Sequence, residues 1–334
     1  MPMLDVFNSK AFSVVSLTES VNRLPYKPGR LGEMGLFTNR GIASSIAVIE
    51  EMDGVLSLLP TKRRGEAATA ARSGRRRARA IETLHIPLEN LVLASDLQDV
   101  RKFGTEDQTD AIASVIADRL QEMRQSHEAT QEYLRVGAIQ GNILDADGST
   151  SLLNLFTEFA KTERSFDFVL GTTTTAIRTI LIQVKRFIEE VLGAVAYEHV
   201  HCFAGKTWFQ RFVSHTAVAA AFDRFQEGSF LRADPRSGFE FCGITFEEYR
   251  GKVGSVDFIP EAVARFVPVG VPGLFTMAYG PADFVETVNT IGIPIYAKQV
   301  IDPEFQRWIK LHTQSNPLPL CTRPEVCVKG TTSN

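Results

Sequence analysis

The closest group of chemically reactive side chains is formed by His199, His201 and Cys202, in the stretch HVHC. Side chains two positions apart in a strand lie on one face, so the two imidazoles would point the same way. With a third ligand they would suit zinc. Because any such pair shares a face, the spacing alone is weak evidence, and we expect ordinary core or surface histidines.

Other candidate residues also lack the spacing that chemistry requires. The stretch DADG (Asp145–Gly148) does not have the ligand spacing of a calcium loop and favours a plain turn. Glu247 and Glu248 are adjacent and would point to opposite faces of a strand. The patterns of phosphate loops, dinucleotide-binding loops, nucleophile elbows and C-x-x-C sites are all missing. We therefore expect no enzyme and no catalytic, cofactor-binding or metal-binding residues.

The cysteines and the apolar stretches indicate where the protein is made. Cys202, Cys242, Cys321 and Cys327 lie in apolar contexts without close pairing, which is typical of buried thiols in a reducing compartment. The start of the chain lacks the pattern of a signal peptide. The longest apolar stretch is short and broken by prolines and glycines, so no membrane span is expected. The sequence predicts a cytosolic protein.

Charge is unevenly distributed along the chain. The 334 residues are 44% hydrophobic, enough for a sizeable core, and carry a net charge of −3. Between Lys62 and Arg79, which we call the basic segment, eight basic residues face a single acid, Glu66, giving +7. The rest of the chain therefore carries −10. An acidic body with one basic segment can bind other copies of itself.

The basic segment has three interpretations. Sequence-neutral binding to nucleic-acid phosphates is one, although interleaved aromatic residues and a reading helix are missing. A solvated loop without a partner is the second. We favour the third, docking on an acidic protein surface. The candidate basic contacts are Arg63, Arg64, Arg72, Arg75, Arg76, Arg77 and Arg79.

The first hundred residues predict an arm and an extended β-arm. Residues 1–30 contain prolines and little regular period, so this segment should need another surface to lie on. Residues 41–60 predict a hairpin that turns at Asp53-Gly54. Alternating apolar residues continue over 79–93. Because an isolated two-stranded ribbon is marginally stable in water, this β-arm should rest on a partner.

A long helix is predicted from Thr105 to about Val136. It opens with a capping box, Thr105 to Gln108, and has one apolar face. Its polar face is mainly acidic, with Glu106, Asp107, Asp110, Asp118, Glu122, Glu128 and Glu132. We expect Asp110, Asp118 and Glu122 to receive the basic segment of a neighbouring copy.

The remaining patterns complete an α+β fold without internal repeats. A hairpin should turn at Asp147-Gly148, and a helix should span 175–192 and stop at Gly193. Residues 206–225 predict a third helix. From Gly238 onward, short strands and turns with glycine or proline dominate.

Six stretches resemble the lambda-type major capsid protein E family of tailed phages. In the N-terminal half they are RLPYKPGRLGEMGLF and HIPLENLVLASDLQDVRKFG, together with the first residues, MPMLDVF. In the C-terminal half they are GFEFCGITFEEYRGKVG, VPGLFTMAYGPADFVETVNTIGIPIYAKQ and SNPLPLCTRPEVCVKG. The resemblance covers nearly the whole chain in order. It rests on the series of stretches rather than on a catalytic motif.

This resemblance implies the tailed-phage capsid fold of the Hong Kong 97 type. It predicts an N-terminal arm over 1–30, an extended E-loop over 31–95, a peripheral domain with a long spine helix over 96–170 and 300–334, and an axial domain over 171–299. In this fold the E-loop reaches over a neighbouring subunit on the outer side of the shell. Hexamers and pentamers would form an icosahedral shell around double-stranded DNA, bound without sequence specificity.

The resemblance also implies partners. Because the predicted arm starts almost at Met1, scaffold and protease should be separate proteins. A portal and a decoration protein are further candidates, and assembly should occur in the cytoplasm of a bacterial host. Two alternatives stay open: an encapsulin-like bacterial compartment with the same fold, and a nucleic-acid-binding protein that uses the basic segment.

Overall fold

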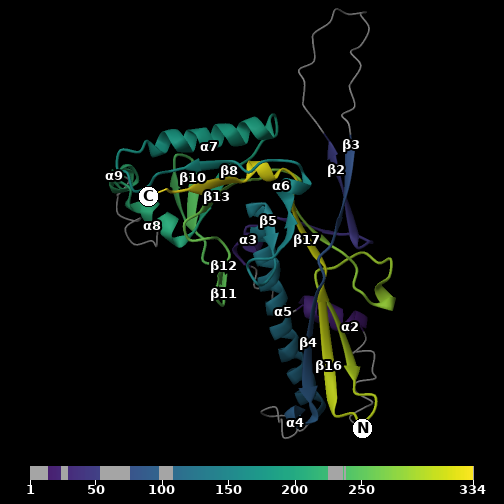
Figure 1. Cartoon of the computed structure of the whole chain (residues 1–334). Coiled ribbons are helices and arrows are strands. Elements are labelled where there is room, and N and C mark those ends of the chain that lie inside the picture. The colour runs from purple at the N-terminus through teal and green to yellow at the C-terminus, as the bar shows by residue number, and fades with distance from the viewer. Residues whose placement is uncertain are drawn as a thin grey trace, which may run out of the picture. The chain divides into compact units, whose positions relative to one another are not determined.

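The computed structural model describes residues 14–23, 29–52, 76–97, 108–224, 236 and 238–333. The chain forms two compact units, each made of separated segments. Unit 1 draws on 1–47, 81–132 and 276–319, and unit 2 draws on 48–80, 133–275 and 320–334. Both units mix helices with strands (Figure 1), which confirms the predicted α+β class.

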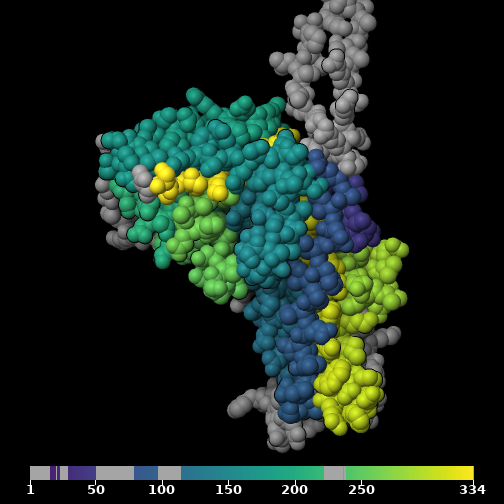
Figure 2. Space-filling view, in the orientation of Figure 1, coloured from purple at the N-terminus to yellow at the C-terminus, as the bar shows by residue number. Residues whose placement is uncertain are grey.

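Unit 1 is built on a three-stranded antiparallel sheet and the first part of a long helix. The sheet has the order β15 (Tyr296–Ile301), β16 (Trp308–Ser315), β4 (Ile86–Leu93). Figure 2 shows β4 in blue beside β16 in yellow. The helix is α5 (Gln108–Gln140). One apolar core joins these elements, with the buried residues Leu17, Val21, Val92, Ile116, Leu120, Met123, Ile295, Ala297, Ile309 and Leu311.

Helix α5 confirms the predicted long helix, with a different end. The sequence places that end at about Val136, but α5 continues to Gln140. Gly137 is accommodated inside the helix, and Gly141, with a φ of +76°, is the residue at which the helix stops. Of the predicted capping box, only Gln108 lies within the described residues.

A short N-terminal helix contradicts part of the predicted arm. Residues 14–23 form α2 (Val14–Arg23), which packs on its own chain through Leu17 and Val21. The Thr18 hydroxyl accepts a hydrogen bond from the Ala297 amide at 3.0 Å. Leu17 and Val21 are four residues apart, as are Thr18 and Asn22, so the members of each pair lie on the same face of the helix. The expectation of little regular period is therefore wrong for 14–23, whereas residues 1–13 and 24–28 lie outside the described chain.

The β-arm contains a two-stranded ribbon. Strand β2 (Ile46–Met52) is hydrogen-bonded to β3 (Arg76–Glu82), which includes the last residues of the basic segment. The predicted turn at Asp53-Gly54 lies outside the described residues. Alternation over 79–93 is divided between β3 and β4, because residues 83–85 leave the strand conformation. Along β4 the even-numbered positions face inward, as the alternation predicts.

Three further elements of the N-terminal half are short. Helices α3 (Arg30–Glu33) and α4 (Ala94–Leu97) have one turn each. Strand β1 (Thr38–Gly41) pairs in parallel with β14 (Phe275–Tyr279), which also neighbours β17 (Pro317–Cys321).

Unit 2 contains a six-stranded mixed sheet under a long amphipathic helix. The sheet order is β7 (Ser165–Asp167), β18 (Val328–Thr331), β13 (Ala264–Val269), β8 (His199–Ala204), β10 (Ile244–Glu248), β9 (Phe239–Phe241). Helix α7 (Ile177–Leu192) lies along this sheet (Figure 1). The helix begins two residues later than predicted and ends at Leu192 as predicted, with Gly193 at a φ of +65°.

The third predicted helix is broken into two. Helix α8 (Lys206–Ser214) and helix α9 (Thr216–Arg224) are separated by His215, whose ψ of 133° is extended. The His215 ring explains the break. Its Nε2 lies 3.1 Å from the Thr172 carbonyl, and its Nδ1 accepts from the Ala217 amide at 3.3 Å. The imidazole therefore caps the first turn of α9, a role that the helical period does not reveal.

The core of unit 2 is aromatic. The side chains of Trp208, Phe212, Phe246, Phe266 and Phe168 are all 0% exposed. Phe212 and Phe246 stack with ring centroids 4.3 Å apart, and Phe168 meets Trp208 edge-on at 5.2 Å. We call these five residues the aromatic core. Such rings bury large apolar areas and add specific ring-to-ring attraction.

The predicted hairpin at Asp147-Gly148 is confirmed. Strands β5 (Asn142–Leu144) and β6 (Ser151–Asn154) pair antiparallel, and helix α6 (Leu155–Glu158) follows. Gly148 has the positive φ, +71°, that this turn requires. The other short elements are β11 (Lys252–Val253), β12 (Val256–Asp257), η4 (Val285–Thr287) and η5 (Pro324–Val326).

The two compact units do not follow the four predicted domain ranges. Strand β4, which the prediction gives to the E-loop, belongs to the sheet of unit 1. Residues 320–334, which it gives to the peripheral domain, supply β18 to the sheet of unit 2. Residues 276–299, given to the axial domain, lie in unit 1. The four named domains of the assembled fold stay a prediction.

Candidate assembly surfaces

Most of the basic segment lies outside the described residues. This applies to Arg63, Arg64, Arg72 and Arg75, while Arg76 and Arg77 belong to strand β3. Among the predicted arginines, the structure gives side-chain contacts only for Arg79. Its guanidinium donates to the Glu158 carbonyl, lies 3.8 Å from the Glu158 carboxylate and stacks on the Phe159 ring at 5.5 Å. Arg79 is therefore bound within its own chain.

The predicted acidic partners lie along α5. Asp118 and Glu122 are exposed, and their spacing of four residues places them on one face of the helix. The Glu122 carboxylate lies 3.2 Å from Arg119, in an ion pair whose side chains are 63% and 41% exposed. Asp110 belongs to the same helix, but its side chain is outside the described set. The structure therefore places two of the three acids together on an exposed face.

Two other acids of α5 correct the predicted acidic face. Glu128 and Glu132 are only 6% and 3% exposed, so they do not belong to the solvent-facing side. Glu132 accepts hydrogen bonds from the Leu31 amide at 2.6 Å and the Gly32 amide at 3.3 Å. A carboxylate that accepts amides at the first turn of α3 stabilises that turn. The helical pattern groups these acids with the exposed ones because it cannot show their buried partners.

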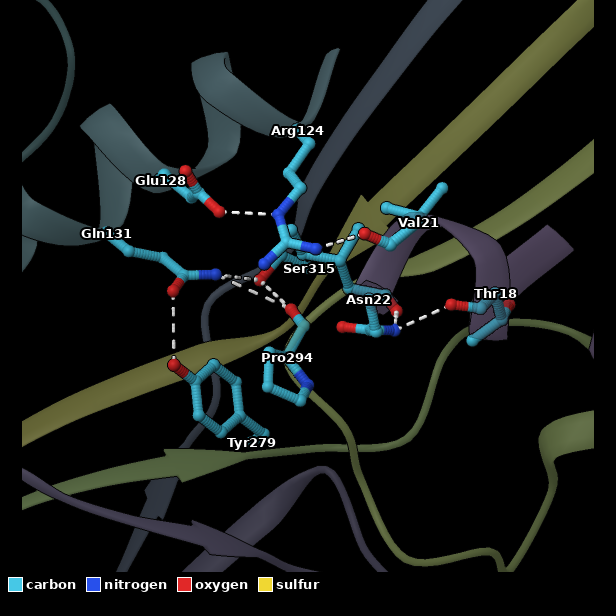
Figure 3. A network of polar contacts seen from close by, with 10 residues as sticks. Thr18, Val21, Asn22, Arg124, Glu128, Gln131, Tyr279, Pro294 and Ser315 are labelled. Carbon is cyan, nitrogen blue, oxygen red and sulfur yellow. Dashed lines mark hydrogen bonds and ion pairs between the residues drawn. The ribbon is translucent and has the colours of Figure 1, made fainter. Parts of the chain in front are cut away.

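Glu128 is part of a buried polar network (Figure 3). Arg124 donates to the Glu128 carboxylate at 2.5 Å and also to the Val21 carbonyl of α2. These side chains are 9% and 6% exposed. A charge-assisted hydrogen bond away from water is directional and strong, so it fixes α2 against α5.

The network continues from α5 to the strands (Figure 3). Gln131 donates from Nε2 to the Ser315 hydroxyl at 3.0 Å and accepts from the Tyr279 hydroxyl at 3.1 Å. Ser315 in turn donates to the Pro294 carbonyl at 2.7 Å. These contacts tie the helix to three separate segments of unit 1. These hydrogen bonds can keep this part of the subunit rigid. They do not place a nucleophile beside a base, as nucleophilic catalysis would require.

A buried histidine completes this side of α5. His127 is 2% exposed, and its Nε2 lies 2.9 Å from the Thr313 hydroxyl of β16. Burial, with a smaller contribution from the charge of His312, lowers the pKa of His127 to about 4. The imidazole is therefore neutral at pH 7 and acts as a core hydrogen-bonding group.

The histidines of the HVHC stretch lie on β8, as the alternation predicts. Their ring centroids are 6.3 Å apart, and His201 pairs with the Glu247 carboxylate at 3.2 Å. Across the described part of the chain, no three histidine, cysteine or acidic residues are gathered for a metal ion. Asp147 accepts from Thr150 and Ser149, which lowers the pKa of its carboxyl well below the usual range. The carboxylate oxygens of Asp147 therefore stabilise the turn through these hydrogen bonds.

The cysteines differ from the prediction in one respect. Cys321 and Cys327 are not close partners by their sequence context, yet their sulfur atoms lie 3.8 Å apart. All four cysteines are free thiols. In the described ranges, no helix is long and apolar enough to cross a membrane.

Comparisons with known proteins identify the chain. A sequence profile described as "Phage major capsid protein E" matches residues 13–332. The major capsid proteins of Pseudomonas phage KPP10 and Salmonella phage Felix O1 are each 25% identical to it. These alignments cover 96% of both chains for the first and 98% of both chains for the second.

Solved structures agree on the fold. The putative capsid protein of a prophage of E. coli CFT073 matches with a TM-score of 0.57 and 14% identity, covering 97% of this chain and 100% of that one. The capsid of cyanophage P-SCSP1u matches with a TM-score of 0.53 and 11% identity, covering 93% of this chain and 90% of that one. The fold is therefore the tailed-phage capsid fold of the Hong Kong 97 type. From this fold and the profile match across the chain, we conclude that the protein is a structural, shell-forming member of the phage major capsid protein E family.

Proposed function

We propose that the protein assembles as hexamers and pentamers into an icosahedral head that encloses the double-stranded DNA of a tailed phage or prophage. The observation that carries this proposal is the match of the family profile over 13–332. Assembly takes place in the cytoplasm of the bacterial host with separate scaffold, protease and portal proteins. The role of the chain is structural, and the DNA is bound without sequence specificity.

We further propose that the basic segment contacts the acidic face of α5 in a neighbouring copy. The charge of +7 on this segment and of −10 on the rest of the chain supports this contact. Asp118 and Glu122 are exposed on α5, and the Glu122 carboxylate has only an exposed ion pair with Arg119 to exchange. Arg79 is left out of the intermolecular set, because it already contacts Glu158 in its own chain. Arginine suits the contact because its planar fork binds a carboxylate through two hydrogen bonds.

The expected energy explains why the contact acts on assembly rather than on folding. One exposed ion pair contributes only about 0.2–1 kcal/mol. The same contact repeats at every subunit boundary of a closed shell, so its contributions accumulate across the lattice. The folded monomer does not depend on it.

The test is a variant with Arg75, Arg76 and Arg77 all changed to Glu, co-expressed with the head genes of its phage. We expect few or no shells in electron micrographs, with a stronger defect at low salt, where charge repulsion is less screened. The circular dichroism spectrum of the soluble subunit should be unchanged. Changing Asp118 and Glu122 to Lys in the same chain should restore part of the assembly.

A matched control distinguishes the effect of the basic segment on assembly from the effect of overall charge. Arg40, Arg186 and Lys206 are exposed residues outside the basic segment, and changing all three to Glu alters the net charge by the same amount. Electron micrographs of this control should show more complete shells than those of the test variant. An equal defect in both variants contradicts the proposed contact. Normal shells that fail only to retain DNA support nucleic-acid binding by the basic segment, and an enclosed enzyme instead of DNA supports an encapsulin-like compartment.

A further inference from the structure

Two buried thiols face each other where the chain passes from one sheet to another. Cys321 is the last residue of β17, and Cys327 directly precedes β18. Their sulfur atoms are 3.8 Å apart, and both side chains are 0% exposed. Between them lies the one-turn helix η5, so the two cysteines close a short loop that we call the thiol loop, residues 321–327.

The thiol loop is held in place from inside and outside. The Cys327 amide donates to the Pro324 carbonyl at 3.1 Å, which keeps η5 wound. Arg323 donates to the Leu192 carbonyl at the end of α7 at 3.3 Å. Glu325 forms an ion pair with Lys161 at 2.9 Å. Because the loop is anchored to separate elements of unit 2, the two sulfur atoms are kept close together.

The other two cysteines provide a contrast within the same unit. Cys202 is also 0% exposed, but it lies in the middle of β8 among the strands of the sheet. Cys242 is half-buried in the turn between β9 and β10. Cys321 and Cys327 alone, among the described residues, have a sulfur–sulfur contact.

We propose that Cys321 and Cys327 are an oxidation site at which a small peroxide produces a disulfide within the chain. One thiolate attacks hydrogen peroxide and becomes a sulfenic acid, and the other peroxide oxygen leaves as hydroxide, which takes up the proton of that thiol to give water. The second thiol then attacks the sulfenic sulfur. The new S–S bond replaces the S–O bond, and the departing hydroxide takes up the second proton as water. The two sulfurs lose two electrons, and the peroxide is reduced.

The geometry requires only a local change. A disulfide has an S–S length of about 2.05 Å, so each sulfur must move by roughly 1 Å. Rotation about the Cα–Cβ bonds and a small adjustment of η5 supply this movement without separating β17 or β18 from their neighbours. Burial keeps the reaction slow, because only a small oxidant reaches the sulfurs.

The protonation state sets when the site reacts. Burial raises the pKa of the Cys321 thiol well above its usual value, and contact with Cys327 raises it further. Since the thiolate is the reactive form, oxidation is slow at neutral pH and accelerates as the pH rises. In a reducing cytosol both residues stay thiols, so the bond is absent while the protein is made and forms only on exposure to an oxidant.

Mass spectrometry tests the site directly. Purified subunit is treated with hydrogen peroxide at pH 7 and pH 9, denatured, alkylated and digested with trypsin. Both cysteines fall in one tryptic peptide, Leu311–Lys329, because proline follows Arg323. We expect this peptide to become lighter by two hydrogens and to resist alkylation. The change should be at least tenfold faster at pH 9, while Cys202 still accepts the alkylating agent.

Two variants keep the proposal falsifiable. In Cys327→Ser the light peptide should disappear and Cys321 should oxidise beyond the sulfenic acid, whereas Cys202→Ser should behave like the wild type. The oxidised wild type should unfold at a higher urea concentration than the reduced form, and Cys327→Ser should show no such increase. The proposal is overturned if peptide 311–329 retains both thiols while Cys242 is oxidised, if the disulfide joins two chains, or if it forms only in urea.

Discussion

The interior of unit 2 is lined by stacked aromatic rings, whereas the long helix of unit 1 meets its neighbours through buried charged and amide side chains as well as an apolar core. Phe246 and Trp208 are 0% exposed and contact other rings. Arg124 and Glu128, by contrast, are ionic groups with 9% and 6% exposure. The same chain therefore stabilises its two units by different physical means.

The difference has consequences for stability and for geometry. An aromatic core gains free energy from area removed from water, and this gain depends little on pH. A buried ion pair gains little net free energy, because desolvation offsets the attraction, but losing one partner is costly. The network therefore fixes one position of α2 and α5 rather than adding much stability.

Two tryptophans make the comparison measurable. The chain contains only Trp208, in the aromatic core, and Trp308, at the start of β16 in unit 1. In a Trp308→Phe background, fluorescence reports on unit 2. In a Trp208→Phe background, it reports on unit 1. Each prediction below refers to unassembled subunit in one of these backgrounds.

The largest effect is expected in the aromatic core. Changing Phe246 to Ala in the Trp308→Phe background should lower the free energy of unfolding of unit 2 by about 4 kcal/mol, because it leaves a cavity among rings that cannot fully collapse. Urea unfolding followed by Trp208 fluorescence measures this loss. The loss should be equal at pH 7 and pH 5, and Val253→Ala, at an exposed position of the same unit, should cost far less.

The next effect concerns the buried ion pair. Arg124→Met in the Trp208→Phe background should destabilise unit 1 by about 3 kcal/mol, because the Glu128 carboxylate stays buried without Arg124. Urea unfolding followed by Trp308 fluorescence is the measurement. The double variant Arg124→Met, Glu128→Leu should recover most of this loss. If the double variant is as unstable as the single one, desolvation of the carboxylate is not the cause.

Acid should destabilise unit 1 more than unit 2. The folded pKa of His127, about 4, lies below the ordinary histidine pKa of about 6.5, so the unfolded chain binds the proton more readily. The contribution of His127 is complete above pH 6.5 and is lost as the pH falls toward 4. Between pH 7 and pH 5 we expect unit 1 to lose about 2 kcal/mol. His127→Gln should flatten this dependence, whereas an unchanged slope would assign it to other groups.

The smallest effect is expected on the exposed side of α5. Arg119→Met removes the partner of Glu122, but both side chains are largely in water. The change should cost less than about 1 kcal/mol, and added salt should reduce that cost. Compared with Arg124→Met, it isolates burial as the variable, since both arginines lie on the same helix. A cost similar to that of Arg124→Met would show that burial does not distinguish the two pairs.

The elements that could be predicted from the sequence are those with a simple period and one apolar face. Helix α7 is an example, because Leu181, Val184 and Ile188 recur at the helical spacing and Gly193 marks its end. The hairpin at Asp147-Gly148 has an equally local signal. The family was recognisable from stretches spread over the whole chain, and the profile match confirms it.

The rest depends on partners that are distant in the sequence. Glu128 and Glu132 look like surface acids until Arg124 and the amides of α3 are placed beside them. The docking of α2 had a weak signal, the pairs Leu17–Val21 and Thr18–Asn22 at a spacing of four residues. For the basic segment and the acids of α5, the contact between copies stays a prediction.

The order of strand β18 in its sheet bears on how the protein is synthesised. This strand lies between β7 and β13, pairing in parallel with the first and antiparallel with the second. A ribosome produces β18 after every other strand of that sheet. Unit 1 likewise cannot complete its three-stranded sheet until β16, which ends at Ser315, has been made. Neither unit can complete its hydrogen bonding during translation before β16 and β18 have emerged from the ribosome, so a nascent chain cannot become competent for assembly before these two strands are free to pair.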